Sequence, residues 1–268
     1  MRHFQKYTHL ISIGIQEALE YKAAFFIFVV SSFFPIIIKY YLWTVIYDNS
    51  PSSVVFGYTS IEMINYTIIS SLISKITVTG FKWDVNDDIK NGGLNKYLIK
   101  PMPYSVYRLC NYIGNKAIQF IIVIIIPFVV IIAFQIFDFQ IKYENIPLFL
   151  IALLMALILN FFMFYSISLC AFWLHEALGV FLLADVIINF LSGGLFPLDV
   201  FGDRVLSILK LLPFQYTIYF PSNVLSGKVE WEEFVMGITY QVIWTGVFIV
   251  ISKWVWRSGI KAFNANGG

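Results

Sequence analysis

Long apolar stretches alternate with short polar segments along this chain of 268 residues. A helix needs about 20 apolar residues to cross the hydrocarbon core of a bilayer, and six stretches reach or approach that length. The pattern therefore predicts an all-α integral membrane protein that forms one domain over residues 1–268. Its six spans are expected at about residues 22–47, 61–80, 109–137, 147–173, 178–196 and 234–256.

An amphipathic segment at about residues 4–20 precedes the first expected span. Its apolar side chains, including Tyr7, Ile11 and Ile15, recur at helical spacing, whereas the polar His9 and Gln16 fall on the opposite face. A helix with this pattern lies in the plane of a membrane surface with its apolar face towards the lipid. The segment therefore predicts an interfacial helix.

The longest polar interruption is Trp83–Tyr104, between the second and third expected spans. Val85 and Ile89 are spaced to share one face of a short helix, whose opposite face would be charged. After it, Gly92 and Gly93 favour a left-handed stop, and a second short helix would follow. The charged positions are Asp84, Asp87, Asp88 and Lys90, and the second helix would carry Leu94, Tyr97 and Leu98 before Lys100-Pro101 ends it. This compact element offers a surface against which another protein can push.

A second irregular region, at about residues 196–233, precedes the last expected span. Within it Val205 and Leu209 share a helical face, Asp203 points away, and Pro213 stops the helix. The periodicity predicts an amphipathic helix that lies in, or dips into, the outer leaflet.

Composition supports the membrane class. The chain is 59% hydrophobic and only 13% charged, with a mean hydropathy of +0.77, which leaves too little polar surface to cover a soluble globule. The net charge of +2 is too small to favour nucleic-acid binding. The cysteines Cys110 and Cys170 show no metal or redox spacing, so no metal site is expected.

The distribution of basic residues gives the expected orientation. The segments placed inside the cell carry more Lys and Arg than those placed outside, as the positive-inside rule requires, so both termini are expected in the cytoplasm. The inner residues are Arg2, Lys6, Lys22, Lys82, Lys90, Lys96, Lys100, Arg108, Lys116, Lys253, Arg257 and Lys261, and the outer ones are Lys142, Arg204, Lys210 and Lys228. Lys39 and Lys75 fall within spans, where we expect their ammonium groups to reach towards the membrane surfaces, with contact to a substrate as the alternative for Lys39.

Enzyme signatures are absent from the sequence. No G-x-x-x-x-G-K-[ST] segment that holds nucleotide phosphates occurs, nor a G-x-S-x-G or an H-E-x-x-H motif. Asp185 is the carboxylate placed deep in a span, where a charge is costly. Asn189, one turn later, and Asn160, in the preceding span, can share its hydrogen bonds. We interpret this group chiefly as a polar clamp between helices, with substrate contact along a translocation pathway as the alternative.

Two motif groups resemble the permease subunits of ABC-2 type exporters, in the bacterial branch with two permeases. The first is Asp88-Ile89-Lys90-Asn91-Gly92-Gly93-Leu94 followed by Tyr97-Leu98-Ile99-Lys100-Pro101. The second is Leu191-Ser192-Gly193-Gly194-Leu195-Phe196-Pro197 followed by Leu211-Leu212-Pro213-Phe214. The terminal run Trp256–Lys261 also resembles this family.

The resemblance implies a type V exporter fold, with an interfacial helix, six spans, a coupling helix between spans two and three, and an outer re-entrant segment before span six. It implies a multi-pass subunit of the plasma membrane that joins a second permease, identical or related, and two separate ATPase chains. ATP and Mg²⁺ would be held by those ATPases, with no cofactor on this chain. The ATPases would press on Asp84–Ile89 and on the N-terminal helix, and cargo would pass along spans that include the second and fifth.

The cargo and two other classes of function stay open at this level. A largely apolar, aromatic interior suits a hydrophobic or amphipathic substrate such as a drug, a peptide or a lipid. A second hypothesis is a secondary transporter or channel that uses Asp185 as a proton or ion site, and it predicts transport without an ATPase. A third, a membrane enzyme or assembly factor, is disfavoured by the missing catalytic pairs.

Overall fold

A computed structural model describes residues 2–20, 22–133, 143–174 and 176–263. This part of the chain is helical apart from one short hairpin, which confirms the all-α class. The elements are α1 (Arg2–Glu20), α2 (Lys22–Asp48), β1 (Val54–Val55), β2 (Tyr58–Thr59), α3 (Ser60–Thr77), α4 (Phe81–Lys90), α5 (Asn95–Leu98), α6 (Tyr104–Ala133), α7 (Ile146–Ser168), α8 (Leu178–Leu191), α9 (Asp203–Leu209), α10 (Tyr219–Ser226) and α11 (Trp231–Ala262).

Three helices in the described residues are long and apolar enough to cross a membrane, namely Val30–Asp48, Ile146–Phe172 and Trp231–Ala262. The other three expected spans coincide with α3, α6 and the shorter apolar helix α8. The last part of the third expected span, residues 134–137, lies outside the described residues. The number of spans stays a prediction.

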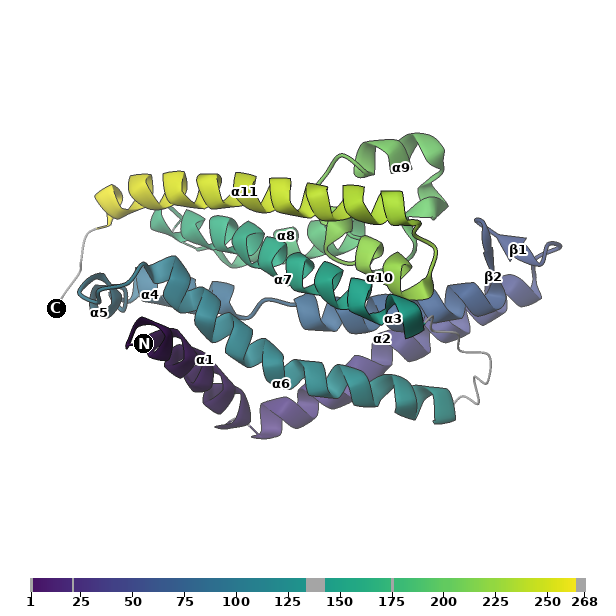
Figure 1. Cartoon of the computed structure of the whole chain (residues 1–268), viewed down its shortest axis with the longest axis horizontal. Helices are drawn as coiled ribbons and strands as arrows, with labels where there is room; N and C mark the ends of the chain where they lie inside the picture. Colours follow the sequence, from purple (N-terminus) through teal and green to yellow (C-terminus); the bar gives the residue numbers. More distant parts are fainter. Residues whose placement is uncertain (1, 21, 134–142, 175, 264–268) are drawn as a thin grey trace.

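The molecule is elongated, and its polar elements gather at its two ends. Figure 1 shows α4, α5, the first turn of α1 and the last turn of α11 at one end, and the hairpin and α9 at the other. Helix α7 lies between α11 and α6 and is apolar all round, as expected of a helix enclosed by others. Its Leu153, Phe161 and Tyr165 are almost fully buried in the main core.

Helix α1 packs along α6 and crosses it closely. Two glycines make this approach possible: a Cβ on Gly14 would meet the carbonyl oxygen of Asn111, and a Cβ on Gly114 would meet that of Ile11. The expected interfacial helix is therefore fixed to the third expected span through its backbone.

The loop after α2 contains a β-hairpin that was not predicted, in which Val54 pairs with Thr59 and Val55 with Tyr58. Phe56 and Gly57 form its turn with positive φ angles of 52° and 79°. Thr59 then caps α3 through a reciprocal pair of bonds with Glu62. The hairpin was missed because Phe-Gly is not one of the usual two-residue turn sequences, which begin with Asn, Asp or Gly.

The Leu191–Pro197 motif forms a junction between distant helices. Gly193 has a φ of 79° and accepts a hydrogen bond at its carbonyl from the Tyr66 hydroxyl, at 2.8 Å. A Cβ on Gly193 would lie 2.7 Å from that hydroxyl and 2.9 Å from the Cβ of Tyr219. The backbone N–H of Tyr219 in turn donates to the carbonyl of Ser192, at 2.9 Å. The glycine is thus required both by its backbone angle and by its neighbours.

Replacing Gly193 with alanine is expected to destabilise the protein by about 2–4 kcal/mol, because left-handed strain and overpacking add. Gly57 is a matched control, since it has the same φ of 79° but nothing within 4 Å of its added Cβ. Gly57→Ala should cost only the strain, about 1 kcal/mol. Thermal unfolding of both purified variants checks this, and equal losses would show that packing at Gly193 is unimportant.

The outer segment before α11 enters the core more deeply than its amphipathic pattern suggests. After α9, Pro213 begins a short 3₁₀ turn, and α10 then buries Phe220, Ser222 and Val224 against α7 and α3. The carbonyl of Tyr216 accepts a bond from the Gln241 side chain of α11 at 2.9 Å. The segment therefore connects α3, α7 and α11.

Candidate functional site

Helix α4 has a buried apolar face and an exposed charged face. Val85 and Ile89 are 0% and 6% exposed, and both belong to the main core beside α7. Asp84, Asp87 and Lys90 are exposed. The apolar pair therefore anchors α4 to its own chain, and a partner protein can touch only the charged face.

Asp88 differs from the sequence-based expectation, because its side chain is buried rather than part of the charged outer face. Its carboxylate forms an ion pair with Arg108, accepts a 2.6 Å hydrogen bond from the Tyr104 hydroxyl, and lies 3.8 Å from the Lys96 ammonium. The Arg108 guanidinium also reaches Asp84 at 3.2 Å. Burial raises the pKa of Tyr104 above its usual value, so the phenol stays a neutral donor. This network fixes α4 to the start of α6.

The segment after α4 adds an aromatic and basic surface. Gly92 takes the left-handed conformation predicted for it, with a φ of 70°, and a Cβ on Gly93 would lie 2.9 Å from the Asp88 carboxylate. The N–H of Leu94 donates to the carbonyl of Asp88 at 2.8 Å, which closes the end of α4. In α5, Tyr97 is buried, and the Lys100 ammonium lies 4.7 Å from the centre of its ring, just before Pro101. We call Phe81–Lys100 the α4–α5 unit.

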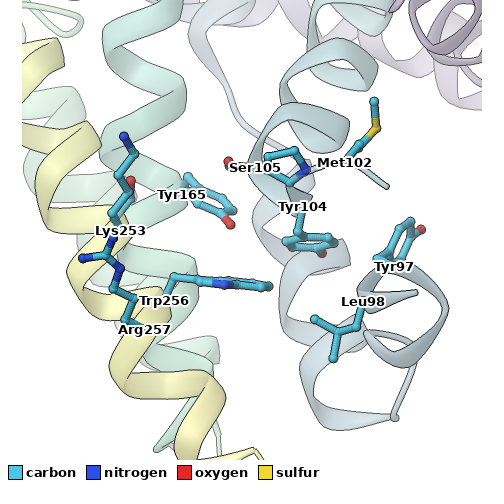
Figure 2. A pocket seen from close by; sticks show the side chains of 11 residues that line it. Tyr97, Leu98, Met102, Tyr104, Ser105, Tyr165, Lys253, Trp256 and Arg257 are labelled. Atoms are coloured by element: carbon cyan, nitrogen blue, oxygen red, sulfur yellow. The ribbon is translucent and has the colours of Figure 1, made fainter. Parts of the chain in front are cut away.

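A pocket of about 310 Å³ separates the α4–α5 unit from the end of α11. Figure 2 shows Trp256 reaching from α11 towards Tyr104, and their rings stack with centroids 5.4 Å apart. Lys253 and Arg257 line the same pocket from α11. The Trp256–Lys261 run thus places an aromatic contact against Tyr104 at the start of α6, next to the α4–α5 unit.

Asp185 forms an ion pair with Lys82, from the first turn of α4. The Lys82 side chain is 3% exposed, whereas that of Asp185 is 41% exposed. A second contact joins the same helices, because the rings of Trp83 and Phe181 meet edge to face at 5.1 Å. The carboxylate thus links α4 to α8 through Lys82, a partner that the sequence did not suggest, rather than through Asn160 or Asn189.

Asn160 and Asn189 nevertheless lie near Asp185, because all three line one cavity of about 360 Å³. We call it the α8 cavity. It lies among α2, α3, α7, α8 and the Leu191–Pro197 junction. Asn160 donates to the backbone carbonyl of Thr77, at 2.5 Å. The other residues that line the α8 cavity include Pro35, Lys39, Ser71, Ser74, Lys75, Phe164, Ile188, Gly194, Leu195 and Ile218.

The two lysines inside expected spans point into the helix assembly rather than towards a membrane surface. The Lys39 ammonium donates to the carbonyl of Gly194 at 2.6 Å and to the Ser71 hydroxyl at 3.0 Å. The Lys75 ammonium donates to the Ser31 hydroxyl at 2.7 Å. Sequence reasoning missed this because the length of a lysine side chain allows either direction.

At the end of the molecule opposite the α4–α5 unit, a cluster of tyrosines around one carboxylate joins the hairpin to the segment before α11. Asp199 accepts hydrogen bonds from the hydroxyls of Tyr58, at 2.6 Å, and Tyr219, at 2.9 Å. Burial raises the pKa of both phenols, and the Asp199 charge adds to the shift. The Lys228 ammonium lies 3.4 Å from the centre of the Tyr58 ring. The cluster joins the hairpin to α10 and was not predicted.

The described residues contain no cluster of side chains suited to bind a metal ion. Across the described residues, no group of three or more His, Cys, Asp or Glu side chains is placed to hold a metal ion. Cys110 is buried and Cys170 is half-buried, and both are free thiols. The polar groups described above instead join helices to one another.

These features define a multi-pass helical membrane protein with a structured polar unit at one end. The chain belongs to the ABC-2 transporter family, because the model of the ABC-2 family transporter protein matches residues 33–267. It is thus a membrane component of an ABC transporter, a family that works with ATPase partners and is generally not catalytic itself. Comparisons with curated proteins and with solved structures find no further match.

Proposed function

We propose that this chain is a permease subunit of an ATP-driven exporter in the bacterial plasma membrane, and that the α4–α5 unit is its ATPase-contacting surface. The permease would cross the membrane six times with both termini in the cytoplasm. It would pair with a second permease, identical or related, and with two ATPase chains. Family membership and the gathering of α4, α5, the first turn of α1 and the last turn of α11 at one end of the molecule support this arrangement.

The observation that carries the proposal is the two-faced character of α4. Its outer face presents Asp84 and Asp87 to a partner, while its inner face is joined to three other helices. Val85 packs into the core beside α7, Asp88 pairs with Arg108 of α6, and Lys82 pairs with Asp185 of α8. A force on the outer face therefore reaches the helices around the α8 cavity without a flexible linker.

The mechanism follows from these connections. ATP and Mg²⁺ bound by the ATPase partners would supply the energy. Closure of the ATPases would push on Asp84 and Asp87, and α4 would move as one body with the start of α6. The Lys82–Asp185 ion pair would carry that movement to α8. The α8 cavity, bounded by α3 and α8, would then change its access for a hydrophobic or amphipathic cargo.

The alternative of a secondary transporter that uses Asp185 as an ion or proton site gains no support. The carboxylate is engaged by the Lys82 ammonium, so an ion would have to displace that buried charge. Membership of a family that works with ATPases also argues against it. Co-purification of the permease from its native membrane tests the point, since an exporter should retain an ATPase chain.

Asp87→Lys is expected to weaken the contact with the ATPase at least about fivefold, because it reverses a charge at the rim of an interface. Asp87 is exposed and forms no ion pair among the described residues, so the fold should be unaffected. Asp203→Lys on α9 makes the same change at the opposite end of the molecule. ATP hydrolysis titrated with each permease variant gives the measurement.

Unchanged half-saturation for Asp87→Lys would contradict the assignment of the α4–α5 unit. Equal losses for Asp87→Lys and Asp203→Lys would point to a general effect of charge rather than to a contact at α4. A loss confined to Asp87→Lys would place the ATPase at this end and both chain termini on the cytoplasmic side.

A further inference from the structure

The α8 cavity carries more positive than negative charge. Three charged side chains line it, Lys39, Lys75 and Asp185. The charge of Asp185 is already neutralised by Lys82, a residue that does not itself line the cavity. Two ammonium groups therefore set the potential inside the cavity, and a cation would be repelled from it.

Lys39 is held there by neutral groups. Its two acceptors are the Gly194 carbonyl and the Ser71 hydroxyl, and no carboxylate of the described residues lies within ion-pair distance. An ammonium group surrounded by apolar helices gains strongly from an anion, because neutral dipoles compensate its desolvation only in part. The position of Lys39 thus favours a negatively charged ligand.

A second polar group in the cavity lacks a partner. The Ser74 hydroxyl is buried and makes no hydrogen bond, although it lines the cavity one turn from Ser71. Buried hydroxyls are almost always satisfied, so an unsatisfied one in a cavity that Lys39 also lines marks a place where a ligand oxygen fits. Lys39 and Ser74 together offer donors to a phosphate, sulfate or carboxylate group.

The remaining wall is mixed, with polar side chains such as Asn160 and Asn189, and its apolar part adjoins surfaces that face away from the protein. Pro35, Phe164 and Ile188 line the cavity. On the two flanking helices, Ile38 of α2 is 65% exposed and Val186 of α8 is 67% exposed. A ligand with a charged head and an apolar tail can therefore place its head in the cavity and its tail along these side chains. The volume of about 360 Å³ suits a headgroup.

We infer that the α8 cavity binds the anionic headgroup of an amphiphile through Lys39 and Ser74. This inference rests on the proposed permease function and names the class of its cargo as amphipathic anions. Binding to the permease alone tests it without an ATPase. Failure of the inference would leave the Asp87→Lys result intact, and failure at Asp87 would leave the cavity's preference intact.

The experiment uses the purified full chain in phosphatidylcholine nanodiscs, with empty discs subtracted. Two dansyl-labelled single-tail probes with the same tail are compared, one with a phosphate head and one with a trimethylammonium head. The phosphate probe is expected to bind at least tenfold more tightly. Lys39→Gln should weaken phosphate binding about tenfold, since a charged hydrogen bond is lost, while Lys39→Arg should keep it within about threefold.

Two further variants separate charge from structure. Ser71→Ala removes a hydrogen bond to Lys39 but keeps its charge, and should retain phosphate binding. Lys253→Gln removes an exposed lysine that lines another pocket, and should also retain it. Equal binding of the two probes, normal binding by Lys39→Gln, or an equal loss in Ser71→Ala would each overturn the inference.

Anionic amphiphiles have two sources, the cargo and the surrounding lipid. Adding phosphatidylglycerol to the discs distinguishes them. Competition with the phosphate probe would identify a membrane lipid as the occupant, and absence of competition would identify a separate cargo. Both results support an anion site in the cavity.

Discussion

Replacing Asp88 with asparagine is expected to lower the apparent melting temperature of the purified permease by about 10 °C. The change removes the buried counter-ion of Arg108, whose side chain is only 8% exposed. Leaving one member of a buried pair without its partner costs about 3–5 kcal/mol, which corresponds to a shift of this size in a chain of this length. Asp84 compensates little, because its side chain is 56% exposed.

Asp87→Asn is the matched control, since it makes the same chemical change one position away on the exposed face of α4. It should alter stability by no more than about 0.5 kcal/mol. Thermal unfolding followed by tryptophan fluorescence compares the two. Similar melting temperatures for both variants would show that the Asp88–Arg108 network does not fix α4 to α6.

Replacing Asp185 with asparagine is expected to destabilise the protein more than replacing Lys82 with methionine. The asymmetry follows from exposure. Loss of the carboxylate leaves the Lys82 ammonium, 3% exposed, without its charge partner, at a cost of about 3 kcal/mol. Loss of the ammonium leaves Asp185, 41% exposed, which water in the α8 cavity can solvate, so the cost should be about 1 kcal/mol.

Both changes should also reduce the stimulation of ATP hydrolysis by cargo, because each cuts the link between α4 and α8. Lys82→Met is the more informative variant, since its fold is expected to survive. Full cargo stimulation in a folded Lys82→Met permease would rule out the ion pair as the connection. A larger loss of stability for Lys82→Met than for Asp185→Asn would contradict the assignment of the buried partner.

Local features of the fold were readable because they depend on neighbouring residues. The Gly-Gly pair after a polar helix predicted the left-handed Gly92, whereas the cap that Thr59 and Glu62 form was not predicted, although its Thr-x-x-Glu spacing is local. The periodicity of Val85 and Ile89 correctly indicated one apolar face. It could not show whether that face meets a partner or the chain's own core.

Contacts between distant residues were not readable. Lys82 and Asp185 are 103 residues apart, and Lys39 and Gly194 are 155 apart. Sequence spacing carries no information on such pairs, because each flexible side chain has several polar groups within reach and only helix packing selects one. The same holds for Asp88, whose charge suggested an exposed position until Arg108 and Tyr104 were found beside it.

The amino-acid pattern by itself determined that this chain is helical, that it belongs in a membrane and that one polar unit interrupts its apolar stretches, since burial of apolar length and backbone preference are properties of short segments. Only the tertiary structure decided which face of α4 is free, that α4 is joined to α8 by an ion pair, and that Lys39 points into a cavity. These outcomes depend on which helices pack together, and packing selects among contacts that are equivalent in sequence.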